Sequence, residues 1–180
     1  MRLLAAVAVY CAAVGSLLAQ DGGLHVPFCD GDNCSDDSLE IVFASGTSTY
    51  VGPIGPGVEF PIRVVIDAQT PTIEANSFAV KHDPESLELV GASVTTQGSI
   101  VDPHDAMTSV RGANFQTTNA VEGGFISAVT LSILDDAFLP LGRNTLCRAG
   151  YRFKEDPECT VIRFAPDELA NGPPVDLVFT

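Results

Sequence analysis

Apolar and polar residues alternate along most of the chain from Leu39 onward. The longest ladder is Val58, Phe60, Ile62, Val64 and Ile66, with Glu59 and Arg63 on the opposite face. A period of two places every second side chain on one side of an extended chain, so the pattern predicts half-buried strands. Shorter stretches of this kind cover residues 39–43, 78–82, 87–94, 115–117, 125–134, 146–153, 159–164 and 175–179.

Turn-forming residues separate these stretches. The segment TYVGPIGPGVEF is rich in Gly and Pro, and Asp83 precedes Pro84 in the order that a type I turn favours. No long amphipathic helix is indicated; residues 102–107 and 166–170 could each form one helical turn. Many short strands of uneven length with almost no helix predict an all-β fold, an antiparallel jelly-roll β-sandwich in preference to a closed barrel.

Two strand pairings follow from the same pattern. Residues 125–134 are apolar on both faces, which predicts a central strand covered on both sides. Residues 146–153 and 159–164 are separated only by the polar segment KEDPE, so we expect them to form a hairpin.

The first 19 residues resemble a secretory signal peptide. One basic residue, Arg2, is followed by an apolar run from Leu3 to Leu18, with small residues at Gly15, Ser16 and Ala19. A membrane-spanning helix is the alternative, but the run is shorter than the roughly 20 residues that such a helix needs. We therefore expect residues 1–19 to be removed, leaving a secreted, extracellular protein that is not inserted in a membrane. A polar lead-in over residues 20–38 and one domain over residues 39–180 would follow.

Four cysteines remain after this cleavage, and an even number in an oxidising compartment predicts disulfide bonds. Cys29 and Cys34 bracket a short loop, and Cys147 and Cys159 lie in the predicted hairpin. Of the three possible connectivities, we expect 29–34 with 147–159. A zinc site is disfavoured, since neither Cys-x-x-Cys spacing nor neighbouring histidines accompany the cysteines.

The chain is strongly acidic, with 9 basic and 23 acidic residues and a net charge of −14. Such a surface repels phosphate backbones and anionic lipid headgroups, so nucleic acid and membrane surfaces are not expected partners. Asp30, Asp32 and Asp36 concentrate hard oxygen ligands and could bind calcium; no other cofactor is expected. The stretch departs from the EF-hand template, because Cys34 takes the third ligand position and the closing Glu is missing. A solvated acidic loop is the alternative.

Three motifs resemble cohesin domains when taken in order. SFAVKHDPESLELVGASV resembles the family's strand, aromatic–Asp–Pro turn and following Leu-x-x-Val strand. GGFISAVTLSIL with FLPLGRNTLCRAGYRF resembles its central region, and CTVIRF with NGPPVDLVF its penultimate region. The match covers residues 39–180, and more narrowly it resembles the cohesin-like domains in large secreted proteins of planctomycete-type marine bacteria. This resemblance implies a jelly roll related to carbohydrate-binding modules, with a role in binding rather than turnover.

The resemblance also implies a further strand after Thr180 that closes the sandwich beside the first strand. Residues 39–43 would then be unpaired on one side in this sequence. The alternative is that VDLVF is itself the closing strand and pairs with residues 39–43.

Departures from the family lie where the partner would be recognised. Ala75 and Ser77 take the positions where cohesins commonly carry Asn and Asp as dockerin contacts, and His82 replaces the usual Tyr. Loops on a rigid sandwich are the other places for specificity. Asp102, His104 and Asp105 form a polar cluster there, either a metal or ligand contact or a solvated loop.

No catalytic residues are predicted. The three histidines lack a nucleophile-elbow sequence nearby, and the adjacent Asp135 and Asp136 would point to opposite sides of a strand. We expect a secreted, non-catalytic module that binds a protein partner of dockerin or scaffold type. A carbohydrate-binding module for polysaccharide degradation is the alternative, and a structural spacer is the third possibility. A flat, apolar sheet face would favour a protein partner, and a groove lined by aromatic and amide side chains would favour a sugar.

Overall fold

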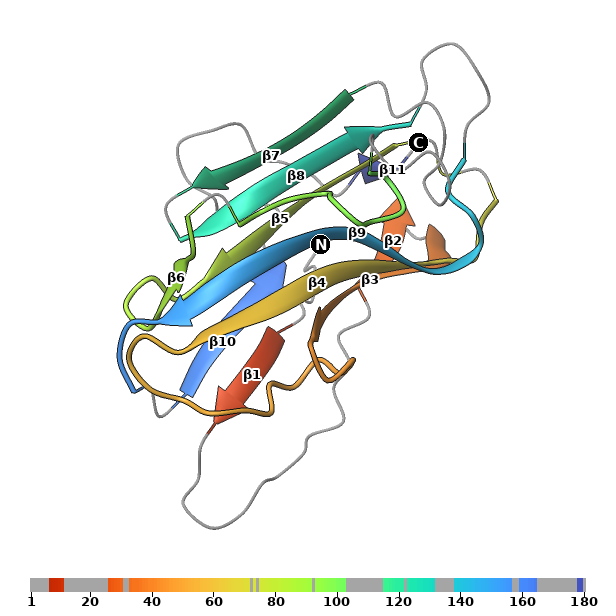
Figure 1. Cartoon of the computed structure of the whole chain (residues 1–180). Helices are drawn as coiled ribbons and strands as arrows, with labels where there is room; N and C mark the ends of the chain where they lie inside the picture. The colour runs from red at the N-terminus through yellow and green to blue at the C-terminus, as the bar shows by residue number, and fades with distance from the viewer. Residues whose placement is uncertain are drawn as a thin grey trace.

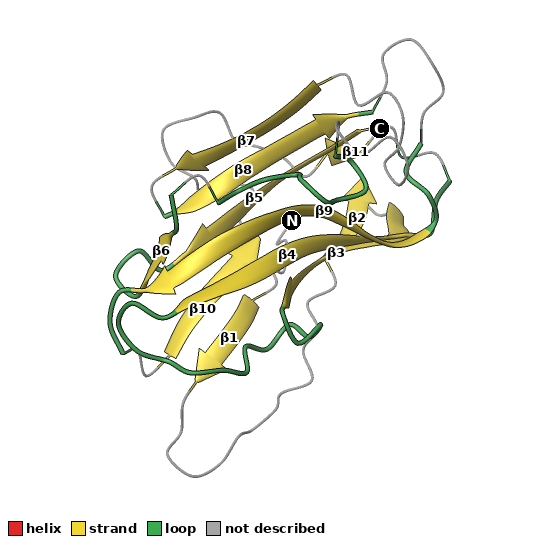
Figure 2. Cartoon of the chain, in the orientation of Figure 1, coloured by secondary structure: helices red, strands yellow, loops and turns green. Residues whose placement is uncertain are grey.

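The computed structural model describes residues 7–11, 26–30, 33–71, 73, 75–91, 93–102, 115–121, 123–131, 138–156, 159–164 and 178–179. These residues form strands and loops, with no helix among them, and the strands lie in two antiparallel sheets (Figures 1 and 2). The all-β antiparallel sandwich expected from the sequence is therefore confirmed. No part of the chain that the structure describes forms a helix able to cross a membrane.

The first sheet, here the β5 sheet, has the order β1-β10-β5-β8-β7, and β11 pairs with one end of β5. Its strands are β1 (Val7–Cys11), β10 (Cys159–Phe164), β5 (Ala75–His82), β8 (Gly124–Thr130), β7 (Phe115–Val121) and β11 (Val178–Phe179). The second, here the β4 sheet, has the order β2-β3-β4-β9-β6. Its strands are β2 (Val26–Asp30), β3 (Asn33–Phe43), β4 (Glu59–Ala68), β9 (Gly142–Phe153) and β6 (Leu87–Leu89).

The core lies between the two sheets and follows the alternation seen in the sequence. Every second residue of β4 and β5 is buried, and the removal of each large apolar side chain from water contributes about 1.5–3 kcal/mol. Aromatic rings close one end of this core, where Phe60 lies 4.8 Å from both Tyr50 and Phe153, centroid to centroid. The largest fully buried side chains are Tyr151, Phe78, Phe125, Phe153, Phe164, Leu39, Ile62, Ile66, Leu87, Leu131, Leu139 and Leu146.

An irregular segment covers the free edge of β9. After β6, Val90 donates a backbone hydrogen bond to Gly150, and Thr95 exchanges two with Arg148. Ile100 then donates to the carbonyl of Thr145. Residues 87–100 thus follow β9 along much of its length, and this pairing protects the edge from other chains.

The predicted hairpin of residues 146–153 and 159–164 is wrong. β9 pairs with β4 and β6, whereas β10 pairs with β5 and β1 in the opposite sheet. The chain crosses from one layer to the other between them, and facing sheets lie about 10 Å apart. A disulfide requires Cα atoms closer than about 7 Å.

The predicted disulfide between Cys147 and Cys159 is accordingly wrong as well. Cys147 is a free, buried thiol in the core. Burial raises its pKa to about 12, which keeps the thiol protonated. The other predicted bond stays a prediction, since the register places Cys29 opposite Cys34 in the β2–β3 pair and the described part of these residues is their backbone.

Other expectations about the strands met different outcomes. β8 buries one face, and its other face is half-buried, so it is not covered on both sides as predicted.

The turn at Asp83 is confirmed, because its carboxylate accepts hydrogen bonds from the Glu85 amide and the Ser86 hydroxyl. β3 begins at Asn33 and pairs with β2, so residues of the predicted lead-in belong to the β4 sheet. Of the VDLVF segment the structure describes Val178 and Phe179, and these pair with β5 rather than with residues 39–43.

Candidate interaction surfaces

The outer face of the β5 sheet carries short side chains at its centre. Residues of β5, β8 and β10 that alternate with the buried ones point away from the core, and the register sets Ala79 opposite Ile126 and Lys81 opposite Arg163. Ile126, Ala128 and Val161 are half-buried apolar residues on this face. The face, here called the β5 face, therefore offers a small-residue apolar centre with two basic residues at one end.

Ala75, Ser77 and Ala79 are alternate residues of the same strand, β5. Their backbones pair with Thr130 and Ala128 of β8. The described part of both residues is their backbone, which lies in β5 beside β8. Their role in binding stays a prediction.

A stacking platform for sugars is not present among the side chains that the structure describes. Tyr50 donates a hydrogen bond from its hydroxyl to the Pro53 carbonyl, and its ring packs against Phe43 and Phe60. Tyr151 is fully buried. Both rings are therefore committed to the core, and the chain has no Trp.

His82 and Tyr151 are buried polar residues whose rings meet between the two sheets, and Thr160 is a further buried polar residue on β10. The His82 ring lies 5.1 Å from the Tyr151 ring, edge to face. His82 Nδ1, the Tyr151 hydroxyl and the Thr160 hydroxyl are buried and have no hydrogen-bond partner. Desolvation lowers the pKa of His82 to about 4, and it raises that of Tyr151. At neutral pH both side chains are uncharged, and their burial removes them from contact with a substrate.

Asp102, one of the three polar residues predicted to form a binding cluster, has a structural role in its loop. Asp102 is only 5% exposed, and its carboxylate accepts a hydrogen bond of 2.7 Å from the Gly98 amide. Its own amide donates to the Ser99 carbonyl. The carboxylate therefore fixes the loop rather than facing solvent. His104 and Asp105 lie outside the described residues.

The calcium site predicted at Asp30, Asp32 and Asp36 stays a prediction. Asp32 lies outside the described residues, and only the backbone of the other two is described. Where side chains are described, no three His, Cys, Asp or Glu residues come together as a metal site. Asp37, in the same acidic stretch, is buried and accepts hydrogen bonds from the amides of Gln69 and Thr70, at 2.6 and 2.8 Å.

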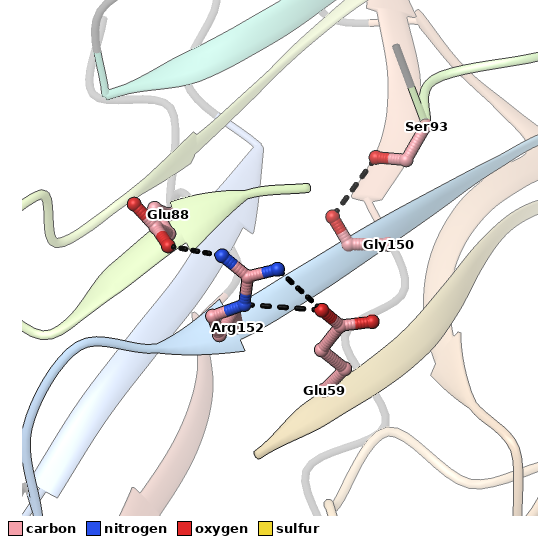
Figure 3. Close-up of polar contacts among 5 residues, drawn as sticks. All are labelled: Glu59, Glu88, Ser93, Gly150 and Arg152. Atoms are coloured by element: carbon pink, nitrogen blue, oxygen red, sulfur yellow. Dashed lines mark hydrogen bonds and ion pairs between the residues drawn. The ribbon is translucent and has the colours of Figure 1, made fainter. Parts of the chain in front are cut away.

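Sequence reasoning missed a concentration of arginines on the outer face of the β4 sheet. Arg152 of β9 lies between Glu59 of β4 and Glu88 of β6 and contacts both (Figure 3). Further along, Arg63 of β4 lies directly opposite Arg148 of β9. The ladder in the sequence places Arg63 on this face, but only the strand register identifies its neighbour.

A surface hollow of about 300 Å³ lies beside this arginine pair. Ala44, Pro61, Ile62, Arg63 and Arg148 line it. Arg148 Nη2 donates a 3.0 Å hydrogen bond to the Gly98 carbonyl, which holds the guanidinium against the loop. Among the residues that the structure describes, no carboxylate contacts either guanidinium.

Comparisons with known proteins found cohesins. No protein-family model matches the chain, and no curated protein matches it. A type II cohesin domain from the cellulosome of Acetivibrio cellulolyticus is 16% identical, with a TM-score of 0.48 over 77% of this chain and 80% of that one.

Two further solved structures are of the same kind. A type III cohesin module from the ScaE cell-surface anchoring scaffoldin of Ruminococcus flavefaciens is 14% identical, with a TM-score of 0.46 over 80% of this chain and 72% of that one. The sixth cohesin of Acetivibrio cellulolyticus scaffoldin B, in complex with a mutant Cel5 dockerin, is 11% identical, with a TM-score of 0.44 over 63% of this chain and 75% of that one. Each is a cohesin domain, the family that the sequence motifs resemble.

Proposed function

We propose that the chain is a secreted, non-catalytic module that binds a protein partner across the β5 face. The observation that carries this proposal is the character of that face: a regular sheet surface whose centre has the half-buried Ile126 and Ala128 beside the fully buried Ala79. Small and half-buried apolar residues on a rigid sheet allow close approach of another protein surface and release water when it binds.

A protein partner fits these side chains better than a polysaccharide does. Sugar rings are usually bound by exposed aromatic side chains, and the described tyrosines are committed to the core. The sequence motifs add support, because they resemble cohesins, whose solved structures include complexes with dockerins. A dockerin-type or scaffold module is therefore the partner that we propose.

Substitutions on the β5 face test the proposal. Purified protein is titrated by calorimetry against a panel of dockerin modules and, separately, against cellulose, chitin and xylan. We expect saturable binding by a protein partner, and Ile126→Arg should weaken it at least about tenfold, because a charged side chain at the centre of an interface disrupts packing and desolvation.

Val51→Arg is the matched control, since Val51 is an aliphatic residue on an exposed loop, 70% exposed. It adds the same charge and should leave affinity unchanged. Saturable polysaccharide binding with no response to any dockerin would contradict the proposal in favour of a carbohydrate-binding module. Equal loss of affinity in both variants would contradict the position of the interface.

A further inference from the structure

We propose a second binding site, for a single carboxylate of an acidic protein segment, at the Arg63–Arg148 pair on the outer face of the β4 sheet. This sheet is opposite the one that carries the β5 face, and the inference does not depend on the proposed function. The ligand would be an Asp or Glu side chain held between the two guanidinium groups, above the hollow that Pro61 and Ala44 line.

The pair is unusual because like charges face each other directly across two strands. Such cross-strand pairs are destabilising in the absence of a counter-charge. The chain has 23 acidic residues and only 9 basic ones, so a carboxylate would be the commoner neighbour for each arginine. Among the side chains that the structure describes, no carboxylate contacts Arg63 or Arg148. A favourable partner from outside the domain resolves this conflict.

The other carboxylates of this face lie beyond the pair at either end, and one of them, Asp67 opposite Arg143, accepts a hydrogen bond from Gln69 Nε2. Glu40 forms an ion pair of 2.7 Å with Arg143. Glu59 and Glu88 both contact Arg152. The face therefore has two carboxylates around one arginine at either end, and between the ends two arginines that no described carboxylate contacts.

Both guanidinium groups extend from fixed backbone. Arg63 lies on β4, which has β3 on one side and β9 on the other. Arg148 donates to the Gly98 carbonyl, and the Gly98 amide is in turn held by Asp102. Because both backbones and the Arg148 guanidinium are held before a ligand arrives, less ordering is needed to bind one.

The surroundings favour one carboxylate over an extended polyanion. Glu40, Glu59 and Glu88 flank the pair, and the whole chain carries a charge of −14. A nucleic acid or an acidic polysaccharide would bring further negative charge against these groups. An acidic side chain on an otherwise neutral protein segment meets the arginines alone, and arginine binds carboxylates with good geometry.

A titration followed by NMR tests the site. The isotope-labelled full chain is titrated with the blocked peptide Gly-Glu-Gly-Glu-Gly, with the same peptide carrying Gln for Glu, with trigalacturonate and with inorganic phosphate. We expect the Glu peptide to produce saturable shifts at the Nε–Hε groups of Arg63 and Arg148 and at the amides of neighbouring β4 and β9 residues. The Gln peptide should produce none at equal concentration.

Variants assign the effect to the pair. Arg63→Gln and the double variant with Arg148→Gln should weaken binding of the Glu peptide at least about tenfold, since each removes charge-assisted hydrogen bonds. Lys154→Gln makes the same change in net charge six positions beyond Arg148 and should leave the affinity unchanged. Without ligand, Arg63→Gln should not lower the thermal midpoint, because it relieves a repulsion.

Three results would overturn the site. One is equal binding of the Glu and Gln peptides, or no binding of either. Another is phosphate or trigalacturonate binding as strongly as the Glu peptide, which would indicate a general anion or sugar contact. The third is unchanged affinity in the folded double variant. None of these bears on Ile126, so failure here and failure of the proposed function are distinguishable.

Discussion

The surroundings of His82 disfavour the protonated, charged form of its ring. The residue is 6% exposed, its ring packs on the edge of Tyr151, and its Nδ1 has no hydrogen-bond partner. Desolvation is the largest effect on its pKa; Asp83 raises the value and Lys154 lowers it further. The net result is a folded-state pKa of about 4 against an ordinary value of 6.5.

This residue should make the protein less stable in acid. Above pH 6.5 the ring is neutral in the folded and unfolded states, and its contribution is fully present. As the pH falls from 6.5 towards 4, the unfolded state takes up a proton that the folded state does not, so the free energy of unfolding decreases. Each unit of difference in pKa corresponds to about 1.4 kcal/mol.

Urea unfolding at pH 7, 5.5 and 4.5 measures this effect. In His82→Phe, which keeps a flat ring against Tyr151, the decrease over this pH range should be smaller by about 1 kcal/mol or more. An identical pH dependence in the variant and the original protein would show that His82 is not responsible.

Asp37 connects two elements that are distant in sequence. Its carboxylate lies at the β3 side of the sandwich and accepts the amides of Gln69 and Thr70, which begin the turn after β4. These amides follow the last residue of the strand, so the ladder supplies no partner for them. The carboxylate therefore ends β4 and fixes the direction of the connection to β5.

Loss of this acceptor should destabilise the whole sandwich. Asp37→Ala leaves two amides without their partner, and we expect a loss of about 2–4 kcal/mol in the free energy of unfolding. Asp37→Asn keeps one acceptor oxygen and should cost less, about 1 kcal/mol. Chemical unfolding followed by circular dichroism compares the two. Equal losses would mean that the charge, rather than the acceptor geometry, matters.

Period-two alternation predicted where the strands are, but not what they pair with. Residues 58–66 and 78–82 were found in β4 and β5 because burial of one face requires the alternation. Strands β9 and β10 were assigned to one hairpin because a short polar segment joins them, although the same segment can also cross between layers. The arginine pair was missed for the same reason, since facing residues are defined by the register of two strands and not by either sequence.

Positions at the β5 face were predictable only through family motifs. Ala75 and Ser77 have no chemistry of their own that marks them as contacts, and they were identified by their place in a motif that resembles cohesins. Asp102 was identified by its polar surroundings, yet it caps a loop. A carboxylate that binds backbone amides and one that binds a ligand have the same signature in a sequence.

At the scale of the whole molecule, the presence of β1 determines whether one edge of the β5 sheet is covered. Its residues, Val7–Cys11, belong to the segment predicted to be removed on export, yet they pair with residues 159–163 of β10 along one edge of the β5 sheet (Figure 1). Precursor and processed protein would then differ in which backbone groups of β10 are available. Exposed edges of this kind accept strands from other chains.

Hydrogen–deuterium exchange distinguishes the two forms. Amides in β10 should exchange faster in a chain that begins at residue 20 than in the full chain, while those of β4, central in the other sheet, should not change. Unchanged protection of β10 would mean that β1 does not guard the edge.

If residues 1–19 are removed on export, as the sequence predicts, and if the difference is found, proteolytic processing would determine when this edge becomes available. A precursor with a closed edge would travel without self-association, and the cut made on export would open that edge only after the chain has left the crowded compartment where it was synthesised. The N-terminal segment would then control when assembly begins, as well as direct export.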